Sequence, residues 1–186
     1  MRTYEQACNE NALTSDIYLH LPILHQYASE CLSVTEIGLG TTANSVLAFL
    51  KGCKNVTSID IDPMPKVVAS VKEYAESIGS NWNFICKDSR LEPIEETDFL
   101  FIDGEHSYRA VKRELELHAP QVRRYIGFHD VVSFASRNEN PNEIGSKFIE
   151  GIVPAIFEFL VQNPWWRIDY YSPYCNGLLI LRDENS

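Results

Sequence analysis

The sequence is poor in the features that mark membrane, secreted and nucleic-acid-binding proteins. No apolar run approaches the ~18 residues of a membrane-spanning helix, and the N-terminal MRTYEQACNENA lacks the apolar segment of a signal peptide. Basic residues are few: 16 Lys and Arg stand against 26 Asp and Glu, for a net charge of −10. So acidic a chain repels a phosphate backbone. We therefore expect a cytoplasmic protein that binds neither membranes nor nucleic acid.

Disulfide and zinc-site patterns are lacking as well. The five cysteines are an odd number, and no two form a CxxC pair. We expect them to be reduced thiols that mostly pack in the core. The chain has no internal repeat and no low-complexity linker, and its 186 residues suit one domain.

The sequence does contain a regular alternation of short apolar runs and helical patterns. This alternation predicts an α/β fold, a Rossmann-like seven-stranded mostly parallel sheet with helices on both faces. Only the last two runs are close enough for a hairpin, so one strand near the edge should be antiparallel. The expected strands are 34–37, 56–60, 82–87, 99–102, 125–128, 166–171 and 178–181. The expected helices are 22–31, 44–50 and 144–160, with two more between them. One of these is capped by Asp62 and has Pro63 at its first position, and the other has an apolar stripe from Tyr108 to His118.

Polar residues collect where the expected strands end. In an open parallel sheet, ligands bind beyond the carboxyl ends of the strands. Paired glycines bring backbone amides close to a ligand at a helix start, and an aspartate at the next strand end can accept both hydroxyls of a ribose. The clusters at such ends are Gly38-Leu39-Gly40, Asp60, Asp103 with His106, and His129-Asp130.

These clusters leave two cofactors open. The glycine turn also fits the dinucleotide pattern GxGxx[GA], and Tyr108 with Lys112 matches the YxxxK pair of short-chain dehydrogenases. A nicotinamide-dependent reductase is therefore one interpretation. Glu36 favours S-adenosylmethionine instead, because a carboxylate in a buried strand is costly without a partner. The amino group of a methionine moiety, or a neighbouring backbone amide, would supply one.

The motifs together resemble the class I S-adenosylmethionine-dependent methyltransferases. EIGLG, SIDID, KDS and FIDGEHSY carry the resemblance, which spans Val34 to Leu181. It is closest to the small-domain branch of metal-dependent sugar and natural-product O-methyltransferases. The resemblance implies that residues 33–183 form the cofactor-binding methyltransferase domain, with 1–32 as a helical segment that packs on or covers the cleft. Thr42 departs from the pattern, since many members have a third glycine there.

The resemblance also implies which residues bind the cofactor. The two glycines would face its methionine part, Asp60 its ribose, and Asp88 with Ser89 its adenine. The full set of expected cofactor-binding residues is Glu36, Gly38, Gly40, Asp60, Asp88, Ser89 and Asp103.

In that branch an aspartate binds magnesium and a histidine three residues later is the general base, which implies catalytic roles for Asp103 and His106. The other ligands are an acidic pair, represented here by His129 and Asp130. Asp103, His129 and Asp130 are thus the expected ligands of Mg²⁺ or another divalent cation. The implied reaction is O-methylation of a small hydroxylated acceptor, sugar-like or natural-product-like. A regulatory or assembly protein that binds the cofactor without turnover is a further interpretation, and self-association into a homo-oligomer stays open.

Overall fold

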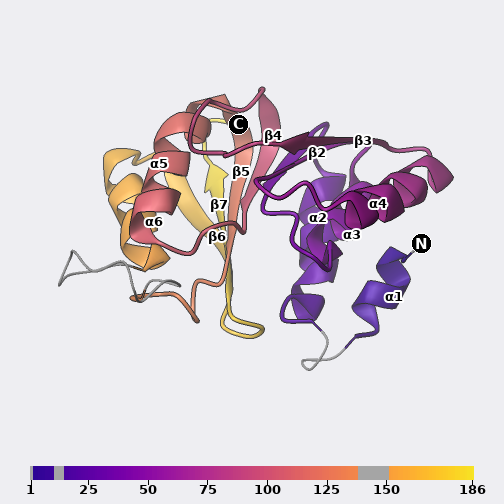
Figure 1. Cartoon of the computed structure of the whole chain (residues 1–186). Helices are drawn as coiled ribbons and strands as arrows, with labels where there is room; N and C mark the ends of the chain where they lie inside the picture. The colour runs from indigo at the N-terminus through magenta and orange to yellow at the C-terminus, as the bar shows by residue number, and fades with distance from the viewer. Residues whose placement is uncertain (1, 11–14, 138–150) are drawn as a thin grey trace.

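The computed structural model describes residues 2–10, 15–137 and 151–186. Its centre is a seven-stranded sheet with the order β3-β2-β1-β4-β5-β7-β6 (Figure 1). Only β7 runs antiparallel to its neighbours. The expected fold, with one antiparallel strand next to the edge, is therefore confirmed. The strands are β1 (Val34–Ile37), β2 (Asn55–Asp60), β3 (Asn81–Cys86), β4 (Thr97–Ile102), β5 (Val122–His129), β6 (Trp166–Ser172) and β7 (Leu178–Asp183).

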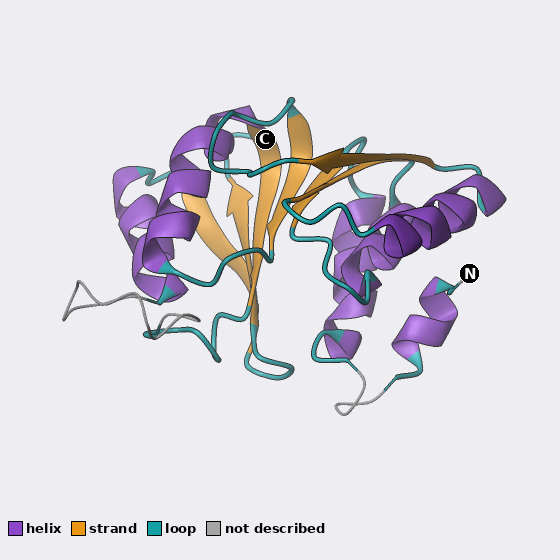
Figure 2. Cartoon of the chain, in the orientation of Figure 1, coloured by secondary structure: helices purple, strands orange, loops and turns teal. Residues whose placement is uncertain are grey.

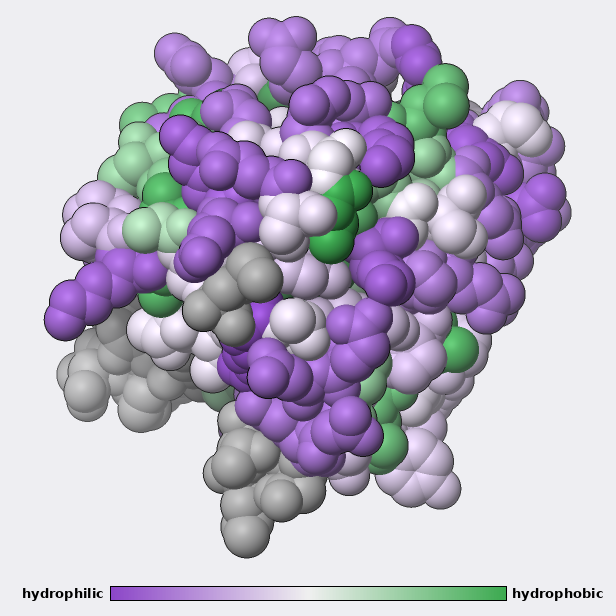
Figure 3. Space-filling model, turned by 90° about the vertical axis from the view of Figure 1, so that its right-hand side faces the viewer, coloured by the Kyte–Doolittle hydropathy of each residue, from purple (hydrophilic) through white to green (hydrophobic). Residues whose placement is uncertain are grey.

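Helices cover both faces of the sheet in two groups (Figure 2). None of the described helices is long and apolar enough to cross a membrane. The face shown in Figure 3 is mostly hydrophilic, and hydrophobic residues appear on it singly or in small groups. The first group is α1 (Tyr4–Cys8), the 3₁₀ turn η1 (Tyr18–His20), α2 (Leu21–Ser29), α3 (Asn44–Gly52) and α4 (Pro65–Ser77). The second is α5 (Tyr108–His118), the 3₁₀ turn η2 (Ala119–Gln121) and α6 (Ile152–Gln162).

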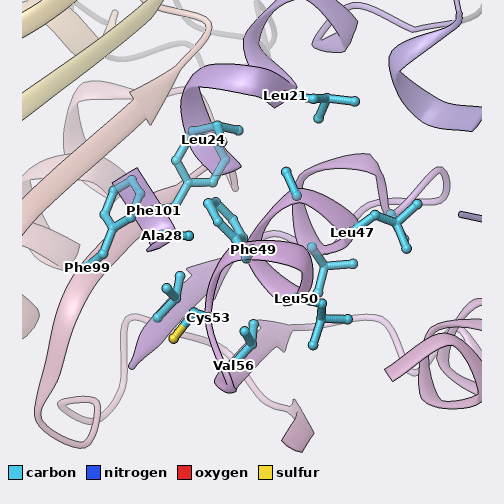
Figure 4. Packing of buried hydrophobic residues seen from close by; sticks show 14 of the residues in the cluster. Leu21, Leu24, Ala28, Leu47, Phe49, Leu50, Cys53, Val56, Phe99 and Phe101 are labelled. Carbon is cyan, nitrogen blue, oxygen red and sulfur yellow. The ribbon is translucent and has the colours of Figure 1, made fainter. Parts of the chain in front are cut away.

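The N-terminal helix α2 is part of the main hydrophobic core. Leu24 and Ala28 of α2 are fully buried beside Phe49 of α3 (Figure 4). The Phe49 ring lies edge-on to Phe99 and Phe101 of β4, with centroids 5.7 and 5.3 Å apart. Full burial of such a side chain stabilises a fold by ~1.5–3 kcal/mol. The helix α2 therefore packs as part of the same hydrophobic core as α3 and β4.

The register of the parallel strands brings their ends together. Ile37 of β1 pairs with Ile59 of β2 and Ile102 of β4, and Ile102 pairs with Phe128 of β5. Because these four residues lie side by side, the residues that follow them share one edge of the sheet. They are Gly38, Asp60, Asp103 and His129.

Two helix starts differ from the prediction. The helix α4 begins at Pro65, after Met64 in a left-handed conformation, and it has no side-chain cap. Asp62 does not cap it, because the Asp62 backbone N–H donates to the Asp60 carboxylate and the chain turns there first. The helix α6 begins at Ile152. Residues 144–150 of the expected helix lie outside the described residues.

The cysteines are less buried than expected, since Cys8 and Cys175 are half-buried and Cys86 is exposed. All five are free thiols, and Cys31 and Cys53 are buried.

Candidate active site

A cavity of about 540 Å³ lies at the carboxyl ends of β1 to β4. We call it the cofactor cavity. Its lining includes six of the seven expected cofactor-binding residues: Gly38, Gly40, Asp60, Asp88, Ser89 and Asp103. The seventh, Glu36, is completely buried one strand position below the rim.

The glycine turn depends on its two glycines for different reasons. Gly38 has φ +89°, and a Cβ there would overlap the carbonyl oxygen of Asp103 and lie 2.9 Å from the Gly104 nitrogen. Gly40 has φ +63°, but a Cβ there would meet nothing within 4 Å. Gly38 is thus required by the contact between the ends of β1 and β4, and Gly40 only by its backbone conformation.

Asp60 joins the end of β2 to the glycine turn. The backbone N–H groups of Leu39 and Gly40 donate to its Oδ2, at 2.9 and 3.3 Å. The Asp62 N–H donates to its Oδ1 at 2.9 Å. A carboxylate has about four acceptor positions, so Asp60 keeps capacity for ribose hydroxyls. A phosphate bound at this turn would need the same two backbone N–H groups, which already donate to Asp60.

Glu36 has partners that the sequence did not indicate. We expected the amino group of a methionine moiety or a backbone amide, and among the described residues the donors to Glu36 are instead two hydroxyl groups, while the expected role toward the cofactor stays a prediction. The Glu36 carboxylate accepts hydrogen bonds from the hydroxyls of Ser45 in α3 and Ser58 in β2. Burial raises the pKa of Glu36 to about 8, against the lowering effect of the two hydroxyls. Glu36 thus connects β1, β2 and α3 beneath the cavity.

Several residues of the cavity wall were not predicted, and two of them, Arg90 and Glu114, contact predicted ones. Arg90 holds the Asp88 carboxylate with Nε and Nη2, both at 2.9 Å, and its Nη1 lies 2.6 Å from Glu105 Oε2. These hydrogen bonds lower the pKa of Asp88. Glu114 of α5 accepts a hydrogen bond from Ser89 Oγ at 2.6 Å, and burial raises its pKa to about 7. The only sequence signal for Glu114 was its place on the buried stripe of α5.

The charge of the cofactor cavity is strongly negative. Six carboxylate side chains and two basic side chains line it. Such a wall attracts a cationic ligand and repels a pyrophosphate group. The residues concerned are Asp60, Asp62, Asp88, Asp103, Glu105 and Glu114, with Lys87 and Arg90.

Next to the cavity, two histidines and two aspartates form what we call the His–Asp cluster: Asp103, His106, His129 and Asp130. His106 Nε2 lies 3.3 Å from Asp103 Oδ1 and 3.1 Å from Asp130 Oδ2. His129 Nδ1 lies 3.3 Å from the same two oxygens. Each carboxylate therefore faces both imidazoles, and Asp103 belongs to both the cluster and the cavity.

The charged members of the cluster strongly shift one another's pKa values. Burial lowers the pKa of His106, but hydrogen bonds to Asp103 and Asp130 outweigh it and raise the pKa to about 10. Burial likewise opposes charge on His129, whose pKa the same carboxylates raise to about 11. Burial raises the pKa of Asp103, but the His129 charge and both histidine hydrogen bonds hold it well below its usual range. The Phe134 ring stacks on His106, with centroids 4.8 Å apart.

Three members of the cluster could hold a metal ion. Asp103, His129 and Asp130 each offer a ligand atom, and these atoms lie within 4.8 Å of one another. Asp130 Oδ1 is buried and has no hydrogen-bond partner among the described residues. His129 Nε2 donates to the Cys175 carbonyl at 2.9 Å, which directs Nδ1 at the carboxylates. Two carboxylates, one of them with an unpaired buried oxygen, and one imidazole fit a divalent cation.

The YxxxK match lies elsewhere. Tyr108 donates its hydroxyl proton to Glu158 of α6, and Lys112 Nζ lies 2.7 Å from Glu158 Oε1. Neither Tyr108 nor Lys112 lines the cofactor cavity. The pair is an ion-paired contact between α5 and α6.

Comparisons with known proteins agree with this geometry. The sequence model of a family described as a methyltransferase domain matches residues 35–131, just over half of the chain. No curated protein sequence matches. The O-methyltransferase from Bacillus cereus, solved in complex with SAH, has a TM-score of 0.63 and 17% identity, over 95% of this chain and 83% of that one. The SAH-bound methyltransferase PaMTH1 from Podospora anserina has a TM-score of 0.60 and 17% identity, over 96% and 85%.

The N-methyltransferase NodS from Bradyrhizobium japonicum has a TM-score of 0.61 and 12% identity, over 90% of this chain and 96% of that one. O- and N-methyltransferases thus share the architecture, so the fold leaves the acceptor atom open. The sheet order and the cavity at its switch point define a Rossmann-like enzyme of class I methyltransferase fold. The chain belongs to the methyltransferase-domain family.

Proposed function

We propose that the protein transfers a methyl group from S-adenosylmethionine to a hydroxyl group of a small acceptor, sugar-like or natural-product-like. The observation that carries this proposal is the position of Asp103, which lines the cofactor cavity and faces both histidines of the His–Asp cluster. This position supports the proposal, because a cofactor in the cavity and a base in the cluster would share one residue. The negative charge of the cavity supports a sulfonium cofactor over a dinucleotide.

When bound, S-adenosylmethionine supplies a methyl group on a sulfonium, which is an excellent leaving group. The chain aligns the partners, and such alignment can lower a barrier by ~7–11 kcal/mol. Asp60 would accept the ribose hydroxyls, and Ser89 and Asp88 would lie beside the adenine. His106 would take the acceptor's proton at Nε2, a role that typically contributes ~10²–10⁴-fold.

Asp103, His129 and Asp130 would hold a divalent cation. Such a cation would neutralise the two carboxylates, lower the pKa of the acceptor hydroxyl and release His106 from its ion pairs. His106 Nε2 lies within 3.3 Å of both carboxylates, so the same two aspartates position the proposed base.

The cofactor is tested by thermal unfolding. S-adenosylmethionine and its demethylated product SAH should raise the melting temperature of the wild type. At a ligand concentration one hundred times Kd, binding stabilises the folded state by about 2.7 kcal/mol. Asp60→Ala should remove that shift, and Glu73→Ala, which deletes an exposed carboxylate of α4, should keep it. Stabilisation by NADH in place of S-adenosylmethionine would reverse the assignment in favour of a reductase.

The acceptor and the cation need separate assays. SAH release should appear with hydroxylated sugars or phenols and not with matched amines, and His106→Gln should slow it by ~10²–10⁴-fold. Mg²⁺ or Mn²⁺ should stabilise the wild type but not Asp103→Ala. Equal responses of the two proteins to the cation would rule out this site, and cofactor binding that survives with no acceptor turnover would favour a regulatory protein.

A further inference from the structure

The turn between β6 and β7 has an unusual backbone. Cys175, Asn176 and Gly177 are three successive residues with positive φ, of 45°, 66° and 96°. Such conformations cost ~1–3 kcal/mol each for non-glycine residues, and they persist only where their surroundings hold them. A Cβ on Gly177 would lie 2.7 Å from Val132, so the turn presses directly on the segment after β5.

Two buried histidines hold the carbonyl groups of this turn. His20 Nε2, from the N-terminal segment, lies 2.8 Å from the Tyr174 carbonyl and 3.2 Å from the Cys175 carbonyl. His129 Nε2 lies 2.9 Å from the same Cys175 carbonyl. Since a carbonyl can only accept, both imidazoles carry a proton on Nε2. The two rings meet edge to face, with centroids 5.7 Å apart.

A second contact ties the same turn to the N-terminal segment. Asn176 Nδ2 donates to Asp16 Oδ2 at 3.2 Å, and Asn176 Oδ1 accepts from Ser133 Oγ at 2.7 Å. The Val132 N–H donates to the Asn176 carbonyl at 2.8 Å. The turn is therefore held between the N-terminal segment and the residues that follow the His–Asp cluster, and both approach it at the lower edge of Figure 1.

We propose that His20 is a positioning residue of the active site: it fixes the Cys175 carbonyl, and that carbonyl aims His129 Nδ1 at Asp103 and Asp130. The N-terminal segment would thus set the geometry of the cluster without touching substrate. The catalytic meaning of this chain of contacts rests on the proposed function. The structural coupling between His20 and His129 does not rest on the proposed function. A test of this coupling can therefore give a positive or negative result whether or not the protein transfers methyl groups.

The primary test is ¹⁵N and ¹H NMR of the histidine side chains in the full-length protein. In the wild type, His129 Nε2–H should give a slowly exchanging, downfield proton signal, assigned by its loss in His129→Gln. His20→Phe keeps the ring volume but removes the donor, so this signal should shift and exchange at least tenfold faster. His20→Gln retains an N–H donor and should restore it.

Controls and outcomes separate positioning from a purely structural role. His25→Phe alters another histidine of the same segment, which packs on Tyr4 with ring centroids 5.3 Å apart, and should leave the His129 signal unchanged. Mn²⁺, used as the probe ion, should bind three- to tenfold more weakly to His20→Phe than to His25→Phe, while SAH affinity stays within twofold. An unaltered His129 signal in folded His20→Phe would overturn the proposal. If that variant does not fold, a wild-type His129 without a proton on Nε2 would overturn it equally.

Discussion

Replacing Gly38 with alanine tests the contact that joins the cofactor cavity to the His–Asp cluster. The new Cβ would overlap the Asp103 carbonyl oxygen, and φ +89° is unfavourable for any L residue. The conformational cost is ~1–2 kcal/mol, and forcing an extra methyl into a packed site costs ~1–3 kcal/mol more. We therefore expect Gly38→Ala to lose about 2–5 kcal/mol of unfolding free energy.

Two other glycines separate the steric effect from the conformational one. Gly40 and Gly79 have φ +63° and +66°, and a Cβ at either would meet nothing within 4 Å. Their alanine variants should lose only the conformational ~1–2 kcal/mol. Gly79 follows α4 outside the cavity lining, so Gly79→Ala should also keep full cofactor binding.

The assay is urea unfolding together with the thermal shift produced by SAH. For a chain of this length, ~1 kcal/mol corresponds to a change of about 2–4 °C in melting temperature. Gly38→Ala should melt markedly below the other two variants and lose the SAH shift, because the clash is relieved only by moving Asp103 away from β1. A Gly38→Ala protein as stable as Gly40→Ala, with an intact SAH shift, would refute the reasoning.

Three further predictions concern buried or paired groups. Burial raises the pKa of Glu36 to about 8, so the folded state holds this proton more tightly. Its contribution to stability is full below pH ~4.5 and is lost towards pH 8, at up to ~1.4 kcal/mol per pH unit. Glu36→Gln should therefore gain unfolding free energy relative to wild type between pH 5 and 8 in urea titrations, and parallel curves would contradict this. Because Asp103 and Asp130 outweigh burial and raise the pKa of His106 to about 10, cation-free methyl transfer should increase from pH 7 towards pH 10, and a saturating divalent cation should move that increase to lower pH. A rate that is flat over this range would exclude His106 as the base. Tyr108→Phe should leave SAH binding and turnover within twofold, since Tyr108 contacts Glu158 outside the cavity, whereas a large loss of activity would revive the reductase interpretation.

The sequence alone was sufficient for the architecture because the relevant signals are local. The apolar run of β4 reflects burial on both faces, and the glycine after β1 reflects a positive φ, so each can be read from a few neighbouring residues. Parallel topology then places strand ends at one edge, so the sequence alone groups Asp60, Asp103 and His129. The first residue of a helix was harder to predict from the sequence. Pro63 and Pro65 both suit the first position of α4, and α4 begins at Pro65 because the chain first turns at the hydrogen bond between Asp62 and Asp60.

Only the tertiary structure decided which partner each polar group has. Glu36 bonds to Ser45 and Ser58, His129 to the Cys175 carbonyl, and that carbonyl also to His20, 155 residues earlier in the chain. No periodic pattern encodes such pairings, because they depend on how separate helices, strands and turns pack together. The sequence determined the fold and the edge where the chemistry lies. The packing determined the charge of the cavity, the pKa values of the His–Asp cluster and the contact of the N-terminal segment with the site.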